Sequence, residues 1–259
     1  MCERHAGIHI LLDKCSIKYN NPHIRNMKFN IQDRGICGSE QEYTMCYNKN
    51  NKNTRLLCGP DWTFIHWPSA SINSFEETKN MIIEESHKEY TVDKIGWYGN
   101  LFSPLNDVIE YITRPLLAQI GEQNPHLFDI VCIIPLHSKI NNIIPNYMSL
   151  PDLVKYRYLI DIGGNGYSGR LKYLLFSKRP LLLVDRNYIE YFHDYLIPYF
   201  HYVPVKMDLS DVLIQAEWMR NNDDKCTKIA ENAYNFAMEN FTEDKILEQV
   251  HNVFIHKTS

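Results

Sequence analysis

A glycine-rich turn constrains the fold of this chain more than any other stretch of its sequence. Residues 163–170 read Gly-Gly-Asn-Gly-Tyr-Ser-Gly-Arg and lie between two apolar runs, at 156–162 and 171–176. Glycine lets the backbone turn sharply and approach a ligand closely, and the first turn of a following helix directs unpaired N–H groups toward that ligand. Arg170 adds a flat cationic donor suited to phosphate. The turn therefore predicts a strand, a binding loop for a phosphorylated ligand, and a helix.

The composition is typical of a soluble globular protein. The chain has 259 residues, of which 44% are hydrophobic and 22% charged, and this length allows a sizeable core. The net charge of −4 gives no support for general nucleic-acid binding. No apolar run approaches the ~18 residues of a membrane span, and the first residues do not resemble a signal peptide. We therefore expect a cytoplasmic protein.

The seven cysteines are scattered and form no Cys-x-x-Cys pair, which favours free thiols in a reducing compartment. The histidines show no zinc-type spacing. No metal site is expected.

Hydrophobic patterning predicts an α/β fold. Strands are expected at residues 8–12, 27–31, 95–98, 128–135, 156–162, 180–184 and 202–205. Helices are expected at residues 74–90, 108–120, 171–178 and 188–197, and, after a capping start at 208–211, through most of the remaining chain. Polar loops are expected at 46–55 and 137–151. The run at 128–135 is apolar enough for a buried parallel strand, and the strands on either side of the glycine turn are expected to pair in parallel.

Two other interpretations of the glycine turn remain open. Residues 164–169 also fit Gly-x-Gly-x-x-Gly, and Asp185 closes the next strand where a dinucleotide-binding fold places its ribose-binding acid. An NAD-type Rossmann oxidoreductase is therefore an alternative. Arg170 stands where that motif has an apolar residue, and little chain follows the turn. The second alternative is a structural turn without a ligand.

Several segments in and around the glycine turn together resemble a known protein family. The segments are Tyr156–Asp161, Tyr167–Leu175, Tyr188–Phe192, Leu196–Val205 and Asp208–Asp211. In this order they resemble glycosyltransferase family 90, which includes protein O-glucosyltransferases and fungal capsule-associated xylosyltransferases. Weaker similarity continues upstream at Asn30–Asp33, Asp61–Phe64, Gly96–Asn100 and Thr113–Leu116. At Tyr98 the family has an arginine instead.

The resemblance implies two Rossmann-like lobes of the GT-B type, with C-terminal helices bracing the lobes. Residues 1–125 would form an N-terminal acceptor-side lobe. Residues 126–259 would form the nucleotide-sugar lobe with the C-terminal helices. The implied reaction transfers a sugar, glucose or xylose, from a UDP-sugar to a hydroxyl of a glycan, lipopolysaccharide or protein, with inversion. The UDP-sugar would be a substrate, and no permanently bound cofactor is expected. The sequence contains no Asp-x-Asp, which favours metal-independent transfer.

The resemblance also implies roles for individual residues. Inversion needs one base, for which Asp33 is the candidate, and fixed donors must meet the departing diphosphate. The expected donor-site residues are Gly164, Gly166, Tyr167, Ser168, Gly169, Arg170, Asp185, Glu190 and Arg114. Glu190 would accept ribose hydroxyls or serve as a helix-start charge, and Asp185 would line the site or pair with Arg186.

The sequence leaves two questions open: the role of four aromatic residues, and whether the chain is catalytic. The aromatic residues Trp62, Phe64, Trp67 and Trp97 would form a sugar platform or belong to the core. The short N-terminal part and Tyr98 also leave room for a non-catalytic, degenerate transferase that binds a nucleotide or a glycan.

Overall fold

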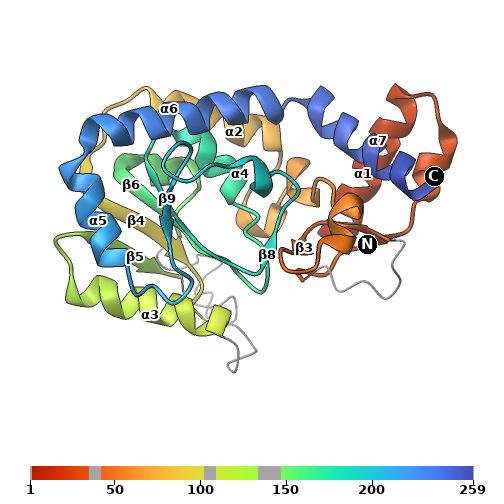
Figure 1. Ribbon diagram of the computed structural model, residues 1–259. Helices are drawn as coiled ribbons and strands as arrows, with labels where there is room; N and C mark the ends of the chain where they lie inside the picture. Colours follow the sequence, from red (N-terminus) through yellow and green to blue (C-terminus); the bar gives the residue numbers. More distant parts are fainter. Residues whose placement is uncertain (1, 35–41, 102–108, 134–146, 259) are drawn as a thin grey trace, which may run out of the picture. The chain divides into compact units, whose positions relative to one another are not determined.

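The computed structural model describes residues 2–34, 42–101, 109–133 and 147–258 (Figure 1). Contacts divide the chain into two compact units that alternate along the sequence. Unit 1 comprises Met1–Thr78, Asn187–Tyr195 and Ala237–Ser259, and unit 2 comprises Lys79–Arg186 and Leu196–Phe236. These units do not follow the division at residue 125, because a strand that lies before that residue pairs with strands that lie after it.

Unit 2 is built around a five-stranded parallel sheet. Its strands are β4 (Val92–Gly99), β5 (Phe128–Cys132), β6 (Tyr156–Asp161), β7 (Leu181–Val184) and β9 (Val203–Val205), in the order β5-β4-β6-β7-β9. All four pairings are parallel, which confirms the expected α/β class. β5 is an edge strand, and its residues after Phe128 are only partly buried. The expectation of a fully buried strand there was wrong, because an edge strand keeps one side open.

Three helices complete the core of unit 2. α3 (Ile109–Gln123), α5 (Val212–Asn221) and the first turns of α6 (Asp223–Asn240) contribute apolar side chains to a cluster on one face of the sheet. Figure 1 shows α3 and α5 beside the sheet. Pro115 lies inside α3. The expected side-chain cap of α5 is absent, because the Asp211 carboxylate accepts from the Lys206 N–H instead.

The glycine turn joins β6 to α4 (Leu171–Leu174), which continues as the short 3₁₀ helix η7 (Leu175–Ser177) and leads into β7. The pairing of Ile160 with Leu182 confirms the predicted parallel unit. The helical segment has a single α-helical turn and is shorter than expected. Lys178 adopts a left-handed conformation with φ of 50°, and Pro180 follows, so the chain leaves the helix at once.

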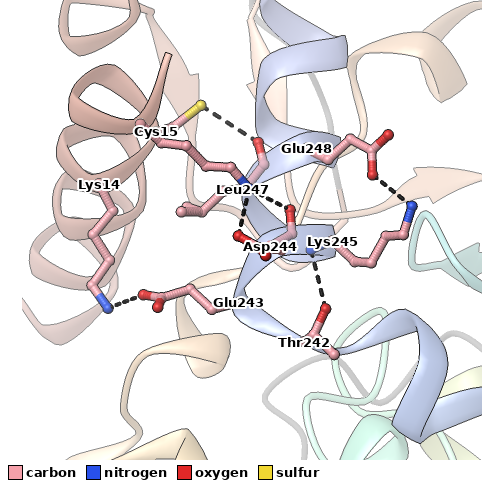
Figure 2. A network of polar contacts seen from close by, with 9 residues as sticks. Lys14, Cys15, Thr242, Glu243, Asp244, Lys245, Leu247 and Glu248 are labelled. Atoms are coloured by element: carbon pink, nitrogen blue, oxygen red, sulfur yellow. Dashed lines mark hydrogen bonds and ion pairs between the residues drawn. The ribbon is translucent and has the colours of Figure 1, made fainter. Parts of the chain in front are cut away.

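Unit 1 is held together by α1 (Glu3–Lys18) and α7 (Glu243–Thr258), the first and last helices of the chain. Figure 2 shows Lys14 of α1 paired with Glu243 of α7, and the Cys15 thiol directed at the Leu247 carbonyl oxygen at 3.5 Å. The predicted strand at 8–12 was wrong. Ile8, Leu11 and Cys15 are buried at helical spacing, and a five-residue apolar window is too short to reveal it.

The other elements of unit 1 are short. β1 (Phe29–Asn30) pairs in parallel with β2 (Tyr43–Thr44), and β3 (Tyr47–Asn48) pairs antiparallel with β8 (Tyr188–Ile189). The 3₁₀ helices of this unit are η1 (Pro22–Asn26), η2 (Lys52–Leu57), η3 (Trp62–Phe64), η4 (Pro68–Ala70) and η8 (His193–Tyr195). Within the described ranges, unit 1 therefore shows two-residue strand pairs in place of a second Rossmann-like sheet. The two-lobed GT-B arrangement is not confirmed.

The structure also differs from the expected helix at 188–197 and the expected loop at 46–55. The predicted helix at 188–197 was wrong, because β8 and η8 occupy it, and the loop at 46–55 contains β3 and the start of η2. α2 (Phe75–Ser86) confirms the helix expected at 74–90, whereas most of the loop expected at 137–151 lies outside the described residues, apart from the start of η6 (Pro151–Lys155).

Six of the seven cysteines lie in the described part of the chain, and all six are free thiols. In the same residues, no helix combines the length and the hydropathy that a membrane crossing requires.

Candidate donor site at the carboxyl edge of the sheet

The order of the strands reverses at the carboxyl ends of β4 and β6. The chain adds β5 on one side of β4 and then returns to place β6 on the other side. Parallel sheets bind ligands in the crevice at such a point. Arg114 of α3 bridges the segments that follow β4 and β6. Its Nε donates to Gly163 O and its Nη1 donates to Asn100 O, both at 2.9 Å. Carbonyl groups that follow both strands therefore hold this guanidinium group in place.

Asp161, the last residue of β6, organises the glycine turn. Its side chain is completely buried, and Oδ1 accepts a hydrogen bond of 2.8 Å from Ser168 Oγ. Oδ2 lies 2.7 Å from Arg186 Nη2, which forms a buried ion pair. Lys172 Nζ also donates to Gly169 O at 3.1 Å. Since a buried carboxylate is stable only with such partners, the turn is held by a charged network, and the Ser168 proton is directed at Asp161.

Arg170, at the end of the turn, is held by the last residues of β4. Its Nη1 donates to Tyr98 O, and its Cζ lies 5.1 Å from the ring centre of Tyr98 and 5.6 Å from that of Trp97. Arg114 lies 5.8 Å from the same Trp97 ring, so one indole ring attracts two guanidinium groups by cation–π interaction. A Cβ atom at Gly99 would stand 2.6 Å from the Trp97 ring and 3.2 Å from Arg170 Nη2. Glycine at this position therefore permits the arrangement.

A hollow opens beside the turn. Its lining comes from α3, the turn and the ends of β7 and β9: Thr113, Ile162, Gly163, Gly164, Gly166, Val184, Asp185, Arg186 and Met207. Two arginine side chains beside the turn have a nitrogen that no described residue satisfies. Arg114 Nη2 lies 3.1 Å from the place where a Cβ atom of Gly164 would stand, and no described residue accepts its hydrogen bond. Arg186 Nη1 is buried and also has no hydrogen-bond partner in the described ranges.

The electrostatics of this edge favour an anion. Burial and the neighbouring charge of Arg170 lower the pKa of Arg114 to about 9, with Arg186 acting in the same direction and Asp161 opposing it. Such a shift means that the positive charge on Arg114 is incompletely compensated. A bound anion would supply that compensation.

Eight of the ten residues that the sequence nominated belong to unit 2. The turn and α3 bring Arg114 together with Gly164, Gly166, Tyr167, Ser168, Gly169 and Arg170, and Asp185 lies at the end of β7. Asp185 is exposed, and its Oδ1 accepts from the Arg186 N–H, while the Arg186 guanidinium pairs with Asp161 instead. Asp185 thus lines the hollow and also pairs with Arg186, through the backbone N–H of Arg186 and not through its guanidinium group.

Asp33 belongs to unit 1, where Arg4 holds it in a two-pronged ion pair. Arg4 Nη1 donates to Oδ1 at 2.6 Å and Nη2 donates to Oδ2 at 3.2 Å, and the Cys46 thiol donates to the Asp33 carbonyl oxygen at 3.1 Å. The side chain is 27% exposed. Asp33 is thus an oriented carboxylate that retains access to solvent.

Glu190 also belongs to unit 1 and follows β8. Its side chain is 2% exposed, and neither carboxylate oxygen has a hydrogen-bond partner within the described residues. His193 Nδ1 is 3.9 Å away. The alternative of a helix-start charge was wrong, because Glu190 lies in the interior and ends a strand segment.

The aromatic residues considered as a sugar platform are mainly core residues. Trp62 and Phe64 are 3% and 4% exposed within unit 1, and Phe64 packs against Phe75 and Phe241. Trp97 is 1% exposed in the sheet core of unit 2. Only small parts of these rings reach solvent, so they are poorly placed to stack on a sugar.

A family model described as "Glycosyl transferase family 90" matches residues 21–257, nearly the whole chain. The chain belongs to glycosyl transferase family 90.

Individual relatives in this family match shorter stretches. The chain is 33% identical over 108 residues to "Protein O-glucosyltransferase 2" of Danio rerio, covering 42% of this chain and 22% of that protein. It is 33% identical over 120 residues to "Protein O-glucosyltransferase 3" of Homo sapiens, covering 45% and 24%. It is 30% identical over 154 residues to "Uncharacterized protein 035R" of Invertebrate iridescent virus 3, covering 53% and 14%. Each match therefore spans less than a quarter of the relative.

Two solved structures show limited similarity. The crystal structure of TarM aligns with a TM-score of 0.42 and 14% identity, over 64% of this chain and 36% of that chain. A glycosyltransferase from Rickettsia africae ESF-5 aligns with a TM-score of 0.38 and 13% identity, over 96% and 52%.

Three residues of this family-90 chain become prominent only in the structure. Asp161 was part of the matched segment but had no assigned role, Lys172 was taken as a helix residue, and Arg186 was considered only beside Asp185. All three are less than 3% exposed. A charged residue at the end of an apolar strand was the available signal, since a parallel sheet buries that position. The arginine that neutralises it, Arg186, lies 25 residues later in the sequence, and no local pattern indicates that ion pair.

Proposed function

We propose that this chain transfers a sugar from a nucleoside-diphosphate sugar, with UDP-glucose or UDP-xylose as the first candidates, to an acceptor hydroxyl. Family membership supports sugar transfer, and the names of the two O-glucosyltransferase relatives favour glucose and a protein or glycan hydroxyl. Transfer with inversion and without a metal ion is part of the proposal. The absence of Asp-x-Asp from the sequence supports the metal-independent form.

One observation carries the proposal. Arg114, Arg170 and Arg186 converge on the glycine turn at the point where the strand order reverses. A departing nucleoside diphosphate develops negative charge, and preorganised donors stabilise that charge without having to move. The anchored arginines and the backbone N–H groups of the turn are suited to this role.

Arg170 is the proposed main contact for the diphosphate. Tyr98 lies where the family has an arginine, and in this chain its carbonyl group and ring support Arg170 instead. Burial raises the pKa of the Tyr98 hydroxyl, so this side chain stays neutral and cannot replace a cation. The positive charge of the proposed donor site therefore comes from the arginines of the turn, of α3 and just after β7.

Asp33 is the proposed base, and Glu190 is the proposed acceptor for ribose hydroxyls. Inverting transfer needs a carboxylate that takes the proton of the acceptor hydroxyl as the new bond forms. The ion pair with Arg4 orients Asp33, and a partly exposed carboxylate is accessible to an acceptor. For Glu190, two buried oxygens without partners among the described residues support a role as a ligand acceptor.

The oxidoreductase alternative has less support. In a dinucleotide-binding fold the glycine motif opens a helix whose N-terminus faces the pyrophosphate, whereas α4 here has four residues. Family membership also favours transfer over hydride chemistry. The non-catalytic alternative requires a turnover measurement.

A donor screen by mass spectrometry tests the proposed function. The protein is incubated with UDP-glucose, UDP-xylose and other UDP-sugars, with and without glycan and peptide acceptors, and both sugar transfer and UDP release are measured. Arg170→Ala should abolish turnover and the rise in melting temperature that UDP produces. If the wild-type protein binds UDP but turns over no donor, the non-catalytic alternative replaces the enzyme. A fluorescence change with NADH and none with UDP would support the oxidoreductase.

A further inference from the structure

Arg186 is a buried cation whose donors are only partly used. Its side chain is 2% exposed, Nε donates to Val184 O at 3.2 Å, and Nη2 lies 2.7 Å from Asp161 Oδ2 and 3.3 Å from Asp161 O. Nη1 is buried, and no described residue accepts its hydrogen bond. A buried guanidinium donor without an acceptor costs free energy. The protein therefore retains, at this point, a donor that a ligand would satisfy.

Arg186, which carries this unused donor, lies beside the glycine turn. Arg186 lines the hollow together with Gly163, Gly164 and Gly166, and the place of a Cβ atom on Gly163 would be 3.7 Å from Arg186 Cδ. The backbone of the turn therefore runs directly against the stem of this arginine. Because β6 and β7 are paired neighbours, the residues that follow them meet at the same edge of the sheet.

The charges around Arg186 also favour an anionic ligand. Asp161 neutralises one positive charge, but neither Arg114 nor Arg170 forms an ion pair with a residue in the described part of the chain. Arg114 directs a second unused nitrogen, Nη2, at Gly164. Two unused guanidinium donors from arginines beside neighbouring residues of the turn match the several acceptor oxygens of a phosphate group.

We propose that Arg186 is a phosphate-binding residue of the donor site. Its Nη2 and Nε hold Asp161 and the end of β7, and its Nη1 donates to a phosphate oxygen of the nucleotide. The identity of that nucleotide rests on the proposed function, whereas the anion contact rests on the geometry of Arg186. The arrangement makes one buried side chain responsible both for the shape of the turn and for recognition of the charge that the turn receives.

The proposal is tested with Arg186→Lys and a matched control, Arg179→Lys. Both arginines flank β7, but Arg179 lies at its start and donates to Val154 O and Lys88 O, away from the turn. Lysine has a single nitrogen, so it cannot hold Asp161 with one nitrogen and present a separate one to a phosphate, as arginine can. Dissociation constants for UDP, inorganic pyrophosphate and uridine are measured by calorimetry, with melting temperatures to show that each variant is folded.

We expect Arg186→Lys to weaken UDP and pyrophosphate binding by about tenfold, the size of one charge-assisted contact, and to leave uridine affinity unchanged. Arg179→Lys should change none of the three. If Arg186→Lys fails to fold, the double variant Asp161→Asn/Arg186→Gln removes both buried charges together, and the same selective loss is expected.

The outcomes separate this proposal from the proposed function. If UDP binds and the ratio of UDP to uridine affinity is the same in Arg186→Lys as in the wild-type protein, Arg186 is structural and the proposal is wrong. If the wild-type protein binds pyrophosphate but not UDP, the assignment of a nucleotide ligand is wrong. The role of Arg186 is then decided by comparing the pyrophosphate affinities of Arg186→Lys and the wild-type protein. If it binds neither, both proposals fail.

Discussion

Ser168 Oγ donates a hydrogen bond of 2.8 Å to Oδ1 of Asp161, and the two residues stand at opposite ends of the glycine turn. Both are buried. The bond closes the turn onto the strand that precedes it, so the turn has a fixed shape before any ligand arrives. A preformed loop contributes to affinity because little conformational freedom remains to be lost on binding.

Ser168→Ala should reduce the free energy of unfolding by about 1.5–3 kcal/mol, because a hydrogen bond to a charged acceptor is lost in the interior. Ser86→Ala is the matched control, since Ser86 is also buried and its Oγ donates to the neutral carbonyl oxygen of Ile83, and the loss of that bond should cost about 0.5–1.5 kcal/mol. Urea denaturation of the three proteins measures both values. Equal losses in the two variants would show that the charge of Asp161 does not strengthen the bond.

The depressed pKa of Arg114 predicts a pH dependence of nucleotide binding. With a pKa of about 9, the guanidinium is charged below that pH and loses its proton as the pH rises through it. Affinity for the diphosphate should therefore be full near pH 8 and fall by roughly tenfold by pH 10, the value of one lost ionic contact. The measured quantity is the ratio of UDP to uridine affinity, which cancels the ionisation of the uracil ring.

Arg114→Gln is the control for this measurement, because it removes the titrating group and keeps the proposed main diphosphate contact, Arg170. The ratio of UDP to uridine affinity should be lower in this variant than in the wild-type protein near pH 8, and it should no longer fall between pH 8 and pH 10. A fall that persists in Arg114→Gln would show that Arg114 is not the titrating group.

Asp33→Asn should retain UDP affinity within about twofold and lose at least about 100-fold in sugar transfer, the usual size of a general-base contribution. Asn preserves the shape of the side chain, but it cannot take a proton. Asp13→Asn is the control, because Asp13 is an exposed carboxylate paired with Arg25 in the same unit. Turnover that survives in Asp33→Asn would assign the base to another residue.

The contact between α1 and α7 predicts a contrast between charge and packing. Lys14→Ala breaks the exposed ion pair with Glu243 and should cost at most about 0.5 kcal/mol, because such pairs are screened by water. Val250→Ala, in the fully buried face of α7, should cost roughly 1–3 kcal/mol through lost burial and a cavity. Chemical denaturation compares the two. A larger loss in Lys14→Ala would mean that the polar contacts of Figure 2 hold the helices together.

The sequence allowed the centre of the fold to be predicted, and physical reasons explain where prediction stopped. β6, the glycine turn and β7 were readable because an apolar run, a cluster of glycines and a second apolar run are local signals. The apolar residues 8–12 would suit a strand as well as a helix. The helical spacing of the buried residues becomes visible only when the window extends to Cys15. β8 was taken for helix because its antiparallel partner, β3, lies about 140 residues away in the sequence.

The residues of the candidate site were likewise predictable only where their signal lies in a short stretch of sequence or in the family resemblance. Arg170 and Ser168 were found because they belong to the turn itself, and Arg114 was found by resemblance. Arg186 was undervalued because its partner, Asp161, lies 25 residues earlier. An arginine that follows a strand normally reaches solvent, and its burial depends on a carboxylate that no local pattern indicates.

The pairing of α1 with α7 has a consequence for the order of folding during synthesis. Unit 2 is complete once residue 236 has left the ribosome, but unit 1 also needs residues 237–259. Until they emerge, the apolar face of α1 that carries Ile8, Leu11 and Cys15 has no α7 to pack against. α1 is thus made before unit 2 but buried only after it. Until α7 emerges, the apolar face of α1 is accessible to chaperones and to other chains.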